Sequence, residues 1–300
     1  MEIGSKTLLR LIKTAKGTLS SIDLDEMRKG QETLGKLGVR LFKKSVDFSN
    51  ADILNVSSFY AVSKKKERED VLFLYLHGGA YVSGEENYSK SFGGVIAERY
   101  NARVVCLNYK LAPENPFPAA LNEAVATYLF LKEKYSKRKL CVIGESAGGG
   151  LALSLALKLR ELKKPLPDAI FAISPWADLE MTGVSLRTNK NEDPLLFEEK
   201  LRINAEMYAQ NNLKNPLVSP VFANFKGFPP IFITVGGKEI LESDSLKVCS
   251  KLLDAGVKFT LLREEKMWHV YPLFPIAEAE TALNKFEEFL VENGIMEEEK

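Results

Sequence analysis

The chain has 300 residues, of which 45% are hydrophobic, so it can fill the core of one large domain or two small ones. This composition excludes a chain that is mainly disordered. The 41 lysines and arginines balance 40 acidic residues, and a net charge of +1 gives no overall field that would draw the chain to nucleic acid or acidic lipid. We therefore expect neither a nucleic-acid partner nor a membrane partner.

The apolar stretches of the sequence favour a cytoplasmic protein. The longest of them, residues 147–157, is too short to span a bilayer and is rich in small residues, which indicates a buried helix. The first residues place Glu2, Lys6 and Arg10 among apolar positions, which is not the pattern of a signal peptide. We expect the protein to act in the cytoplasm.

The cysteines predict neither a disulfide framework nor a structural metal site. Cys106, Cys141 and Cys249 are odd in number and far apart, and the chain has only two histidines to share a metal with them. We expect the three cysteines to fill core positions.

The amino-terminal part of the chain is helical by pattern. Within residues 1–45, Asp23 and Glu26 match the capping-box start of a helix that is expected to end near Gly38. Residues 52–62 then favour an antiparallel hairpin at the start of a sheet.

From residue 72 onward, short apolar strands alternate with helices. Strands are predicted at residues 72–76, 103–108, 140–143, 169–174, 231–235 and 258–262. Helices are predicted at residues 119–135, 147–162, 243–255 and 277–292. Repeated units of this kind form a mostly parallel sheet covered by helices, so the fold class is α/β.

One segment interrupts this alternation. Within residues 181–215, Asp193 and Pro194 predict the N-cap and first residue of an amphipathic helix over 195–208. We expect residues 181–215 and 1–45 to pack together as a helical cap over a core made of residues 46–180 and 216–300. The alternative is an ordinary extra layer of helices.

The motif Gly144-Glu145-Ser146-Ala147-Gly148 lies between a predicted strand and a predicted helix. G-x-S-x-G in this context predicts a nucleophile elbow, a tight turn that raises the serine hydroxyl above the sheet at a helix N-terminus. The small neighbours of Ser146 leave room for such a turn. The alternative is a glycine-rich turn without a catalytic role.

A second glycine-rich turn, His77-Gly78-Gly79-Ala80, follows another predicted strand. Backbone N–H groups at a strand end can bind a developing oxyanion, so Gly78 and Gly79 are predicted donors, together with Ala147 beside the serine. His77 is expected to brace this loop, because it precedes the glycines too closely to reach the serine.

The remaining imidazole, His269, is the candidate general base. The acid that orients its ring is expected between Ser146 and His269 in the chain, where Glu239, Glu242 and Asp244 follow the strand at 231–235. We assign Glu239, because it lies nearest to the carboxyl end of the strand. Glu242 and Asp244 fit the first turn of a helix instead.

At these residues the sequence closely resembles the hormone-sensitive-lipase-like (GDXG) branch of the α/β-hydrolase esterases. The resemblance runs from about residue 72 to about residue 274. Its segments are 77–84, similar to the H-G-G-G loop, 109–114, similar to Y-x-L-A-P-E, and 144–149, similar to G-D-S-A-G-G, with 174–179 and 193–196. It implies an α/β-hydrolase fold, a cap built from the two helical segments, and homodimers, which many members form.

Three residues depart from the family pattern. Ala80 stands at the third glycine of the loop, and its methyl group can narrow the acyl site. Glu145 stands at the usual aspartate and keeps the charge on a longer side chain. Glu239 stands where many members carry aspartate, and a carboxylate one methylene longer can still orient an imidazole.

The motifs and the resemblance together predict a serine-dependent carboxylesterase. It would hydrolyse small esters with short to medium acyl chains through an acyl-enzyme, using neither a metal nor an organic cofactor. A lactone or amide hydrolase would use the same triad and is the alternative. A non-catalytic relative that only binds a small ligand is disfavoured, because both Ser146 and His269 are present.

Overall fold

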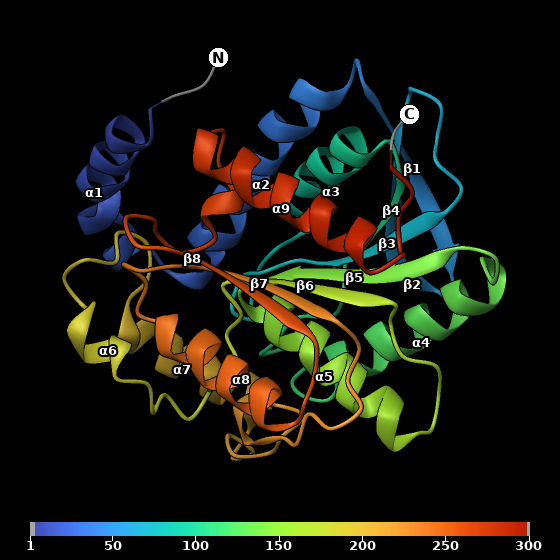
Figure 1. The fold of residues 1–300 in the computed structure, drawn as a ribbon. Helices are drawn as coiled ribbons and strands as arrows, with labels where there is room; N and C mark the ends of the chain where they lie inside the picture. The colour runs from blue at the N-terminus through green and yellow to red at the C-terminus, as the bar shows by residue number, and fades with distance from the viewer. Residues whose placement is uncertain (1–3, 299–300) are drawn as a thin grey trace.

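A twisted eight-stranded sheet runs through the computed structural model, which describes residues 4–298 (Figure 1). Its order is β1-β2-β4-β3-β5-β6-β7-β8. The strands are β1 (Val46–Ile53), β2 (Val56–Ser63), β3 (Val71–Leu76), β4 (Arg103–Leu107), β5 (Lys139–Glu145), β6 (Ala169–Ile173), β7 (Ile231–Gly236) and β8 (Phe259–Glu264). The pairs β1/β2 and β2/β4 are antiparallel, and every other pair is parallel. The predicted α/β fold is confirmed.

Helices cover both faces of the sheet. They are α1 (Ser5–Ser21), α2 (Leu24–Phe42), α3 (Glu86–Tyr100), α4 (Ala119–Lys134), α5 (Ala147–Glu161), α6 (Ser185–Thr188), α7 (Glu198–Ala209), α8 (Glu242–Asp254) and α9 (Ala277–Glu292), with short 3-10 turns η1 (Pro220–Phe222) and η2 (Tyr271–Leu273). Helices α4, α5 and α8 lie on one face and α3 and α9 on the other, with α2 packed against α3 (Figure 1). Of the helices within residues 4–298, none is both long enough and apolar enough to cross a bilayer.

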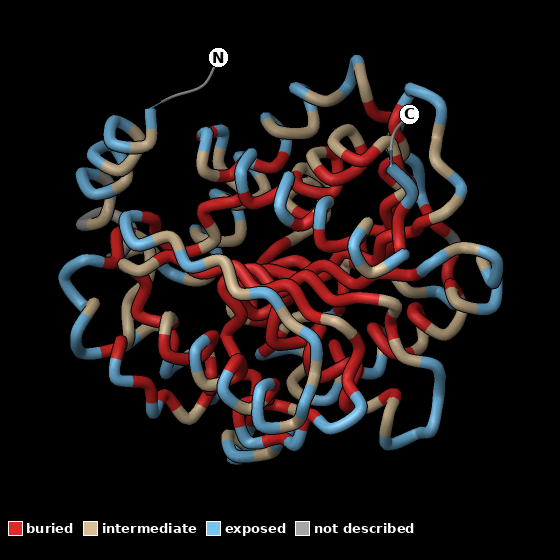
Figure 2. The backbone as a smooth tube through the Cα atoms, in the orientation of Figure 1, coloured by how far each residue is buried: buried red, intermediate tan, exposed pale blue. Residues whose placement is uncertain are grey.

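Alternation along the strands builds a core on each side of the sheet. All six residues of β3 are buried; Leu72 and Leu74 point into the cluster under α4 and α5, whereas Phe73 and Tyr75 point into the cluster under α3 and α9. Figure 2 shows the result as a buried centre with exposed segments around the rim. The sheet therefore serves as a rigid base, and its strands present their carboxyl ends to a common edge.

The six predicted strands are confirmed, and the predicted hairpin is present as β1 and β2, starting at Val46. Helix α3 was missed. Gly93 and Gly94 lie in its middle, and glycine disfavours a helix by about 1 kcal/mol. Tertiary contact outweighs this cost, because a Cβ on Gly93 would lie 2.1 Å from Cys106 Sγ on β4. Glycine is what lets α3 approach the sheet so closely.

Two predicted helix boundaries were wrong. The capping box at Asp23 and Glu26 is present, but α2 continues past Gly38 to Phe42 because its glycines pack against α3. Helix α7 begins at Glu198, so Asp193 is not its N-cap. The Asp193 carboxylate instead accepts the N–H groups of the next turn and of Ile240, which is a contact that the local sequence could not reveal.

The helical segments at the amino terminus and after β6 contact each other. Lys200 Nζ on α7 donates to the Ile22 carbonyl at 2.9 Å, and Lys16 Nζ on α1 donates to the Asp193 carbonyl. Apolar side chains of α1 also pack, together with Leu195, on the cluster around Trp268. Segments that are far apart in the sequence thus meet beside the loop after β8.

The contact between α2 and α3 is testable at Gly35. A Cβ there would lie 2.2 Å from Tyr88 N and 2.3 Å from the Asn87 carbonyl carbon, both backbone atoms. We expect Gly35→Ala to lower the free energy of unfolding by about 1–3 kcal/mol. Gly30→Ala in the same helix is the matched control: it has no atom within 4 Å and should raise that free energy by up to about 1 kcal/mol. Urea unfolding measures both, and stabilisation by Gly35→Ala would contradict this packing.

Candidate active site

The turn between β5 and α5 raises Ser146 above the sheet. Its backbone has φ 54° and ψ −120°, a conformation that side-chain-bearing residues rarely adopt. A Cβ on Gly148 would lie 2.0 Å from the Leu76 carbonyl oxygen, so only glycine lets the first turn of α5 approach the end of β3 this closely. The serine side chain therefore lies at the amino-terminal end of α5, where backbone N–H groups face it.

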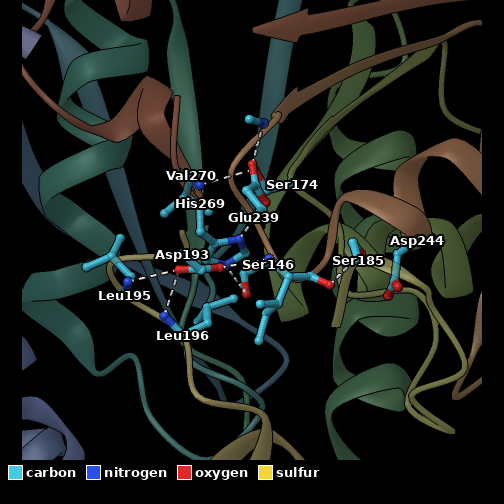
Figure 3. A network of polar contacts seen from close by, with 12 residues as sticks. Ser146, Ser174, Ser185, Asp193, Leu195, Leu196, Glu239, Asp244, His269 and Val270 are labelled. Carbon is cyan, nitrogen blue, oxygen red and sulfur yellow. Dashed lines mark hydrogen bonds and ion pairs between the residues drawn. The ribbon is translucent and has the colours of Figure 1, made fainter. Parts of the chain in front are cut away.

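Three predicted side chains form one chain of hydrogen bonds at the carboxyl edge of the sheet (Figure 3). His269 Nε2 lies 2.9 Å from Ser146 Oγ, and His269 Nδ1 lies 2.9 Å from Glu239 Oε2. Glu239 and His269 are buried, and 9% of Ser146 is exposed. The three come from different loops, after β5, β7 and β8, which a parallel sheet brings to one edge.

The other two acidic candidates point elsewhere. Glu242 pairs with Arg263 and accepts a hydrogen bond from Asn189. Asp244 accepts the N–H groups of Ala177 and Asp178, both at 2.9 Å, and burial together with the nearby Asp178 raises its pKa well above the ordinary value. Of these three acids, Glu239 is the one that touches the imidazole ring.

Ser174, directly after β6, joins the acid to the histidine loop. Its hydroxyl donates to Glu239 Oε1 at 2.7 Å and accepts the Val270 N–H at 3.1 Å (Figure 3). Ser174 and Val270 have positive φ angles of 45° and 51°. The backbone is therefore strained at both residues that this hydrogen bond joins. Ser174 was given no role from the sequence; its place after a buried strand, at the start of the family-like segment 174–179, was the available signal.

The segment after β6 also holds the loop that carries Glu239. Asp193 Oδ2 accepts the Ile240 N–H at 2.9 Å, and Asn189 Nδ2 donates to the Glu239 carbonyl at 2.8 Å. The Ser185 hydroxyl donates to the Ile240 carbonyl at 2.6 Å. Asn189 and Ser185 were not predicted, because a loop this far away in the chain is brought in only by the tertiary fold.

The loop after β3 lies against the nucleophile turn, since a Cβ on Gly78 would lie 3.2 Å from Ser146 Cβ. The N–H of Gly78 donates to Glu145 Oε1, so this predicted oxyanion donor is already engaged, and we revise that assignment. Over residues 4–298, no protein acceptor takes the N–H of Gly79 or of the next residue, Ala80. Ala147 opens α5, and the first N–H groups of a helix have no partner within it.

Glu145 is fully buried beside the serine. Its Oε1 accepts the Gly78 N–H and the Tyr88 hydroxyl, the latter at 3.2 Å. Burial raises the pKa of the Glu145 carboxyl to about 7, against the lowering effect of the Gly78 N–H. The longer side chain at this position thus ties the nucleophile turn to the loop after β3.

His77 braces the same loop. Its Nδ1 lies 2.7 Å from the Gly78 carbonyl oxygen, and its ring stacks on Tyr109 with centroids 4.1 Å apart. The Tyr109 hydroxyl donates to the His77 carbonyl at 2.7 Å. Burial lowers the pKa of His77 to about 4, which keeps the ring neutral at physiological pH. Its contacts are with backbone and aromatic groups, in keeping with the bracing role expected for it.

Among the described residues, 4–298, no group of three or more histidine, cysteine, aspartate or glutamate side chains is arranged to hold a metal ion. The three cysteines are buried and unpaired, and burial raises their pKa values.

Known proteins resemble this chain in sequence. A family model for the α/β-hydrolase fold matches residues 73–273. An acetyl-hydrolase of Streptomyces hygroscopicus is 35% identical over 246 residues, 81% of this chain and 79% of the relative. An esterase of Acinetobacter venetianus is 34% identical over 223 residues, 73% of this chain and 74% of the relative.

Solved structures of esterases resemble this chain over nearly its whole length. The crystal structure of an esterase from the bacterial hormone-sensitive lipase family has a TM-score of 0.88 and 31% identity, covering 98% of this chain and 100% of that chain. The esterase EstE5 soaked with p-nitrophenyl butyrate has a TM-score of 0.84 and 33% identity, covering 94% of this chain and 98% of that chain.

The buried carboxyl of Glu145 should make folding stability depend on pH. Because its pKa is raised in the folded state, that state binds more protons than the unfolded chain between about pH 4.5 and about pH 7. This carboxyl therefore lowers the free energy of unfolding as pH rises through that window, by about 1–3 kcal/mol. Glu145→Gln keeps the acceptor for Gly78 and should gain stability relative to wild type over the same window.

Urea unfolding at several pH values measures this slope. A constant cost of the buried amide shifts the whole Glu145→Gln curve without changing its slope. Glu161→Gln, at the exposed end of α5, is the matched control and should keep the wild-type slope. A difference between Glu145→Gln and wild type that stays constant from pH 4.5 to 7 would contradict a raised pKa at Glu145.

Proposed function

Because this chain belongs to the α/β-hydrolase fold family and is a carboxylic ester hydrolase of its hormone-sensitive-lipase branch, we propose that Ser146, His269 and Glu239 are its catalytic triad. The observation that carries this proposal is the unbroken path from Ser146 Oγ through the imidazole to Glu239, with two contacts of 2.9 Å. This geometry suits proton transfer, because base and nucleophile are within hydrogen-bond distance.

In the first step, Ser146 Oγ attacks the carbonyl carbon of the ester, and His269 Nε2 takes the hydroxyl proton. Glu239 holds the ring through Nδ1 and stabilises its charged form. The tetrahedral intermediate collapses, the C–O bond to the alcohol breaks, and His269 returns the proton to the leaving oxygen. Water then attacks the acyl-enzyme with His269 as base, releasing the acid and restoring Ser146.

The negative charge of the intermediate is bound by backbone N–H groups. We assign Gly79, Ala80 and Ala147, because Gly78 already donates to Glu145. The support is that the N–H groups of Gly79 and Ala80 have no acceptor within residues 4–298 and that Ala147 opens α5 beside the serine. Losing one such donor typically costs 10² to 10³ in kcat.

Residues 1–45 and 181–215 form, in this proposal, a cap over a core of residues 46–180 and 216–300. The contacts of Lys16 and Lys200 between the two segments support it. Aromatic rings fill the space next to the loop after β3: Tyr81 stacks on Tyr208 of α7 with centroids 3.7 Å apart, and the Tyr81 hydroxyl approaches the first turn of α5. We propose that this filled space restricts the substrate to short and medium acyl chains, in keeping with the acetyl-hydrolase relative.

We also propose that the enzyme acts in the cytoplasm and forms a homodimer. All three cysteines are free, as expected in a reducing compartment. Strand β8 ends the sheet, and the unpaired backbone groups of an edge strand can pair with a second copy.

Substitutions of Ser146 and of Glu239 should lower kcat by different amounts. With p-nitrophenyl butyrate as substrate, Ser146→Ala should lower kcat by on the order of 10⁶, and Glu239→Gln by on the order of 10³ to 10⁴. Glu242→Gln is the matched control, because this carboxylate pairs with Arg263 and should leave kcat close to wild type. Full activity of Ser146→Ala, or a loss at Glu242 equal to that at Glu239, would contradict the assignment.

The length of the acyl chain should affect kcat/KM, because aromatic rings fill the space beside Ser146. We expect p-nitrophenyl butyrate to exceed p-nitrophenyl palmitate by at least about tenfold in kcat/KM, or about 1.4 kcal/mol of transition-state binding. The comparison is made with monomeric substrates in detergent-free buffer. Equal or faster turnover of the palmitate ester would show that the aromatic rings leave a long channel.

A further inference from the structure

The outer face of α2 carries apolar side chains that the fold leaves uncovered. Leu34, Leu37 and Leu41 are 67%, 52% and 80% exposed, and their spacing of three and four residues puts them on one stripe. The neighbouring face of the same helix packs on α3 through Gly35 and Gly38. A surface helix normally turns its apolar stripe toward the core, so a second stripe facing outward indicates something that covers it.

Cations lie beside this stripe. An open pocket of ≈ 480 Å³ is formed where the carboxyl-terminal half of α2 meets the β1/β2 hairpin. Its basic lining residues are Lys36, Arg40, Lys43 and Lys64. The acidic residue in the lining, Asp47, lies 3.2 Å from Lys64 and offsets that one charge.

Of the four lining cations, Lys36 and Lys64 have an acidic neighbour, whereas Arg40 and Lys43 have none within residues 4–298. In the part of the chain that the structure describes, residues 4–298, no carboxylate forms an ion pair with Arg40, Lys43 or Lys44. Glu32 lies 3.9 Å from Lys36 but already accepts the Asn87 backbone N–H. A surplus of positive charge therefore flanks the exposed leucines.

We propose that this face, defined by Leu34, Leu37 and Leu41 with the basic pocket beside them, docks onto an anionic lipid surface. A helix that lies in a membrane interface buries leucines at the level of the acyl chains and turns its lysines and arginines to the headgroup phosphates. Each cation near an anionic leaflet adds about 1 kcal/mol of attraction. The net charge of +1 gives no sign of this surface, because it is a sum over the whole chain. The fold brings several of the cations together at one place.

The charges beside the leucines favour a lipid surface over a second copy of this chain and over nucleic acid. A second copy docked on the same face about a two-fold axis would present the same basic residues and offer no carboxylates to pair with them. Nucleic acid would pair with the cations but would leave the three leucines facing phosphate and water. An anionic bilayer offers acyl chains to the leucines and headgroup phosphates to the cations.

Vesicle flotation of the whole chain tests the proposal. The wild type should bind vesicles of phosphatidylcholine with phosphatidylglycerol, should not bind vesicles of phosphatidylcholine alone, and should be released by high salt. Arg40→Glu with Lys43→Glu should weaken binding by at least about tenfold. Leu34→Ser with Leu37→Ser and Leu41→Ser should do the same, even at low salt.

Matched controls come from other exposed surfaces. Lys163→Glu with Lys164→Glu reverses two charges on the loop after α5, and Leu253→Ser removes a leucine of α8 that is 70% exposed. Both should bind vesicles as the wild type does. All variants should hydrolyse p-nitrophenyl butyrate at the wild-type rate, which verifies folding independently of docking.

Three results would overturn the proposal. The first is that wild type does not bind anionic vesicles, whether or not it binds inorganic phosphate in solution. The second is vesicle binding that both α2 variants retain in full. The third is a dimer in sedimentation equilibrium that the leucine variant dissociates, with no vesicle binding, since a second copy would then cover the face.

Discussion

The backbone at Ser146 is held in a conformation that costs about 1–3 kcal/mol, and the geometry of the site depends on it. Hydrogen bonds from Ser146 N to the Ile173 carbonyl at 2.9 Å and from Trp176 N to the Ser146 carbonyl at 2.8 Å fix the turn from the side of β6. On the side of β3, Gly148 permits close approach and Glu145 accepts the Gly78 N–H. The strain is thus maintained by neighbouring strands, and the hydroxyl stays aimed at His269.

Glu239, the proposed acid, is positioned by a different part of the chain. Ser174 and Gly236 donate to one oxygen of Glu239, leaving the other for His269. Asn189 and Asp193, from the segment after β6, hold the surrounding loop. Because Lys16 on α1 donates to the carbonyl of Asp193, a continuous set of contacts runs from the amino-terminal helices to the proposed triad.

The sequence predicted what local chemistry determines. The buried strands, the turns that end them and the serine turn follow from residue types at fixed spacing, and the place of Glu239 just after β7 was the basis for proposing it as the acid. Tertiary contacts decided the rest. Asp193 was taken for a helix cap because its second partner, Ile240, lies 47 positions away in the chain. Helix α3 was missed because its glycines make sense only against β4, and Gly78 was taken for a free donor because Glu145 reaches it only in the folded chain.

The proposed reaction requires a nucleophilic Ser146, and covalent labelling tests this requirement most directly. A fluorophosphonate exchanges its fluoride for the serine oxygen, so intact-mass spectrometry should show one adduct per chain. Peptide mapping should place it on Ser146, and Glu239→Gln should label more slowly, because its ring is less well oriented. An adduct on another residue, or a wild-type chain that takes no label, would contradict the account.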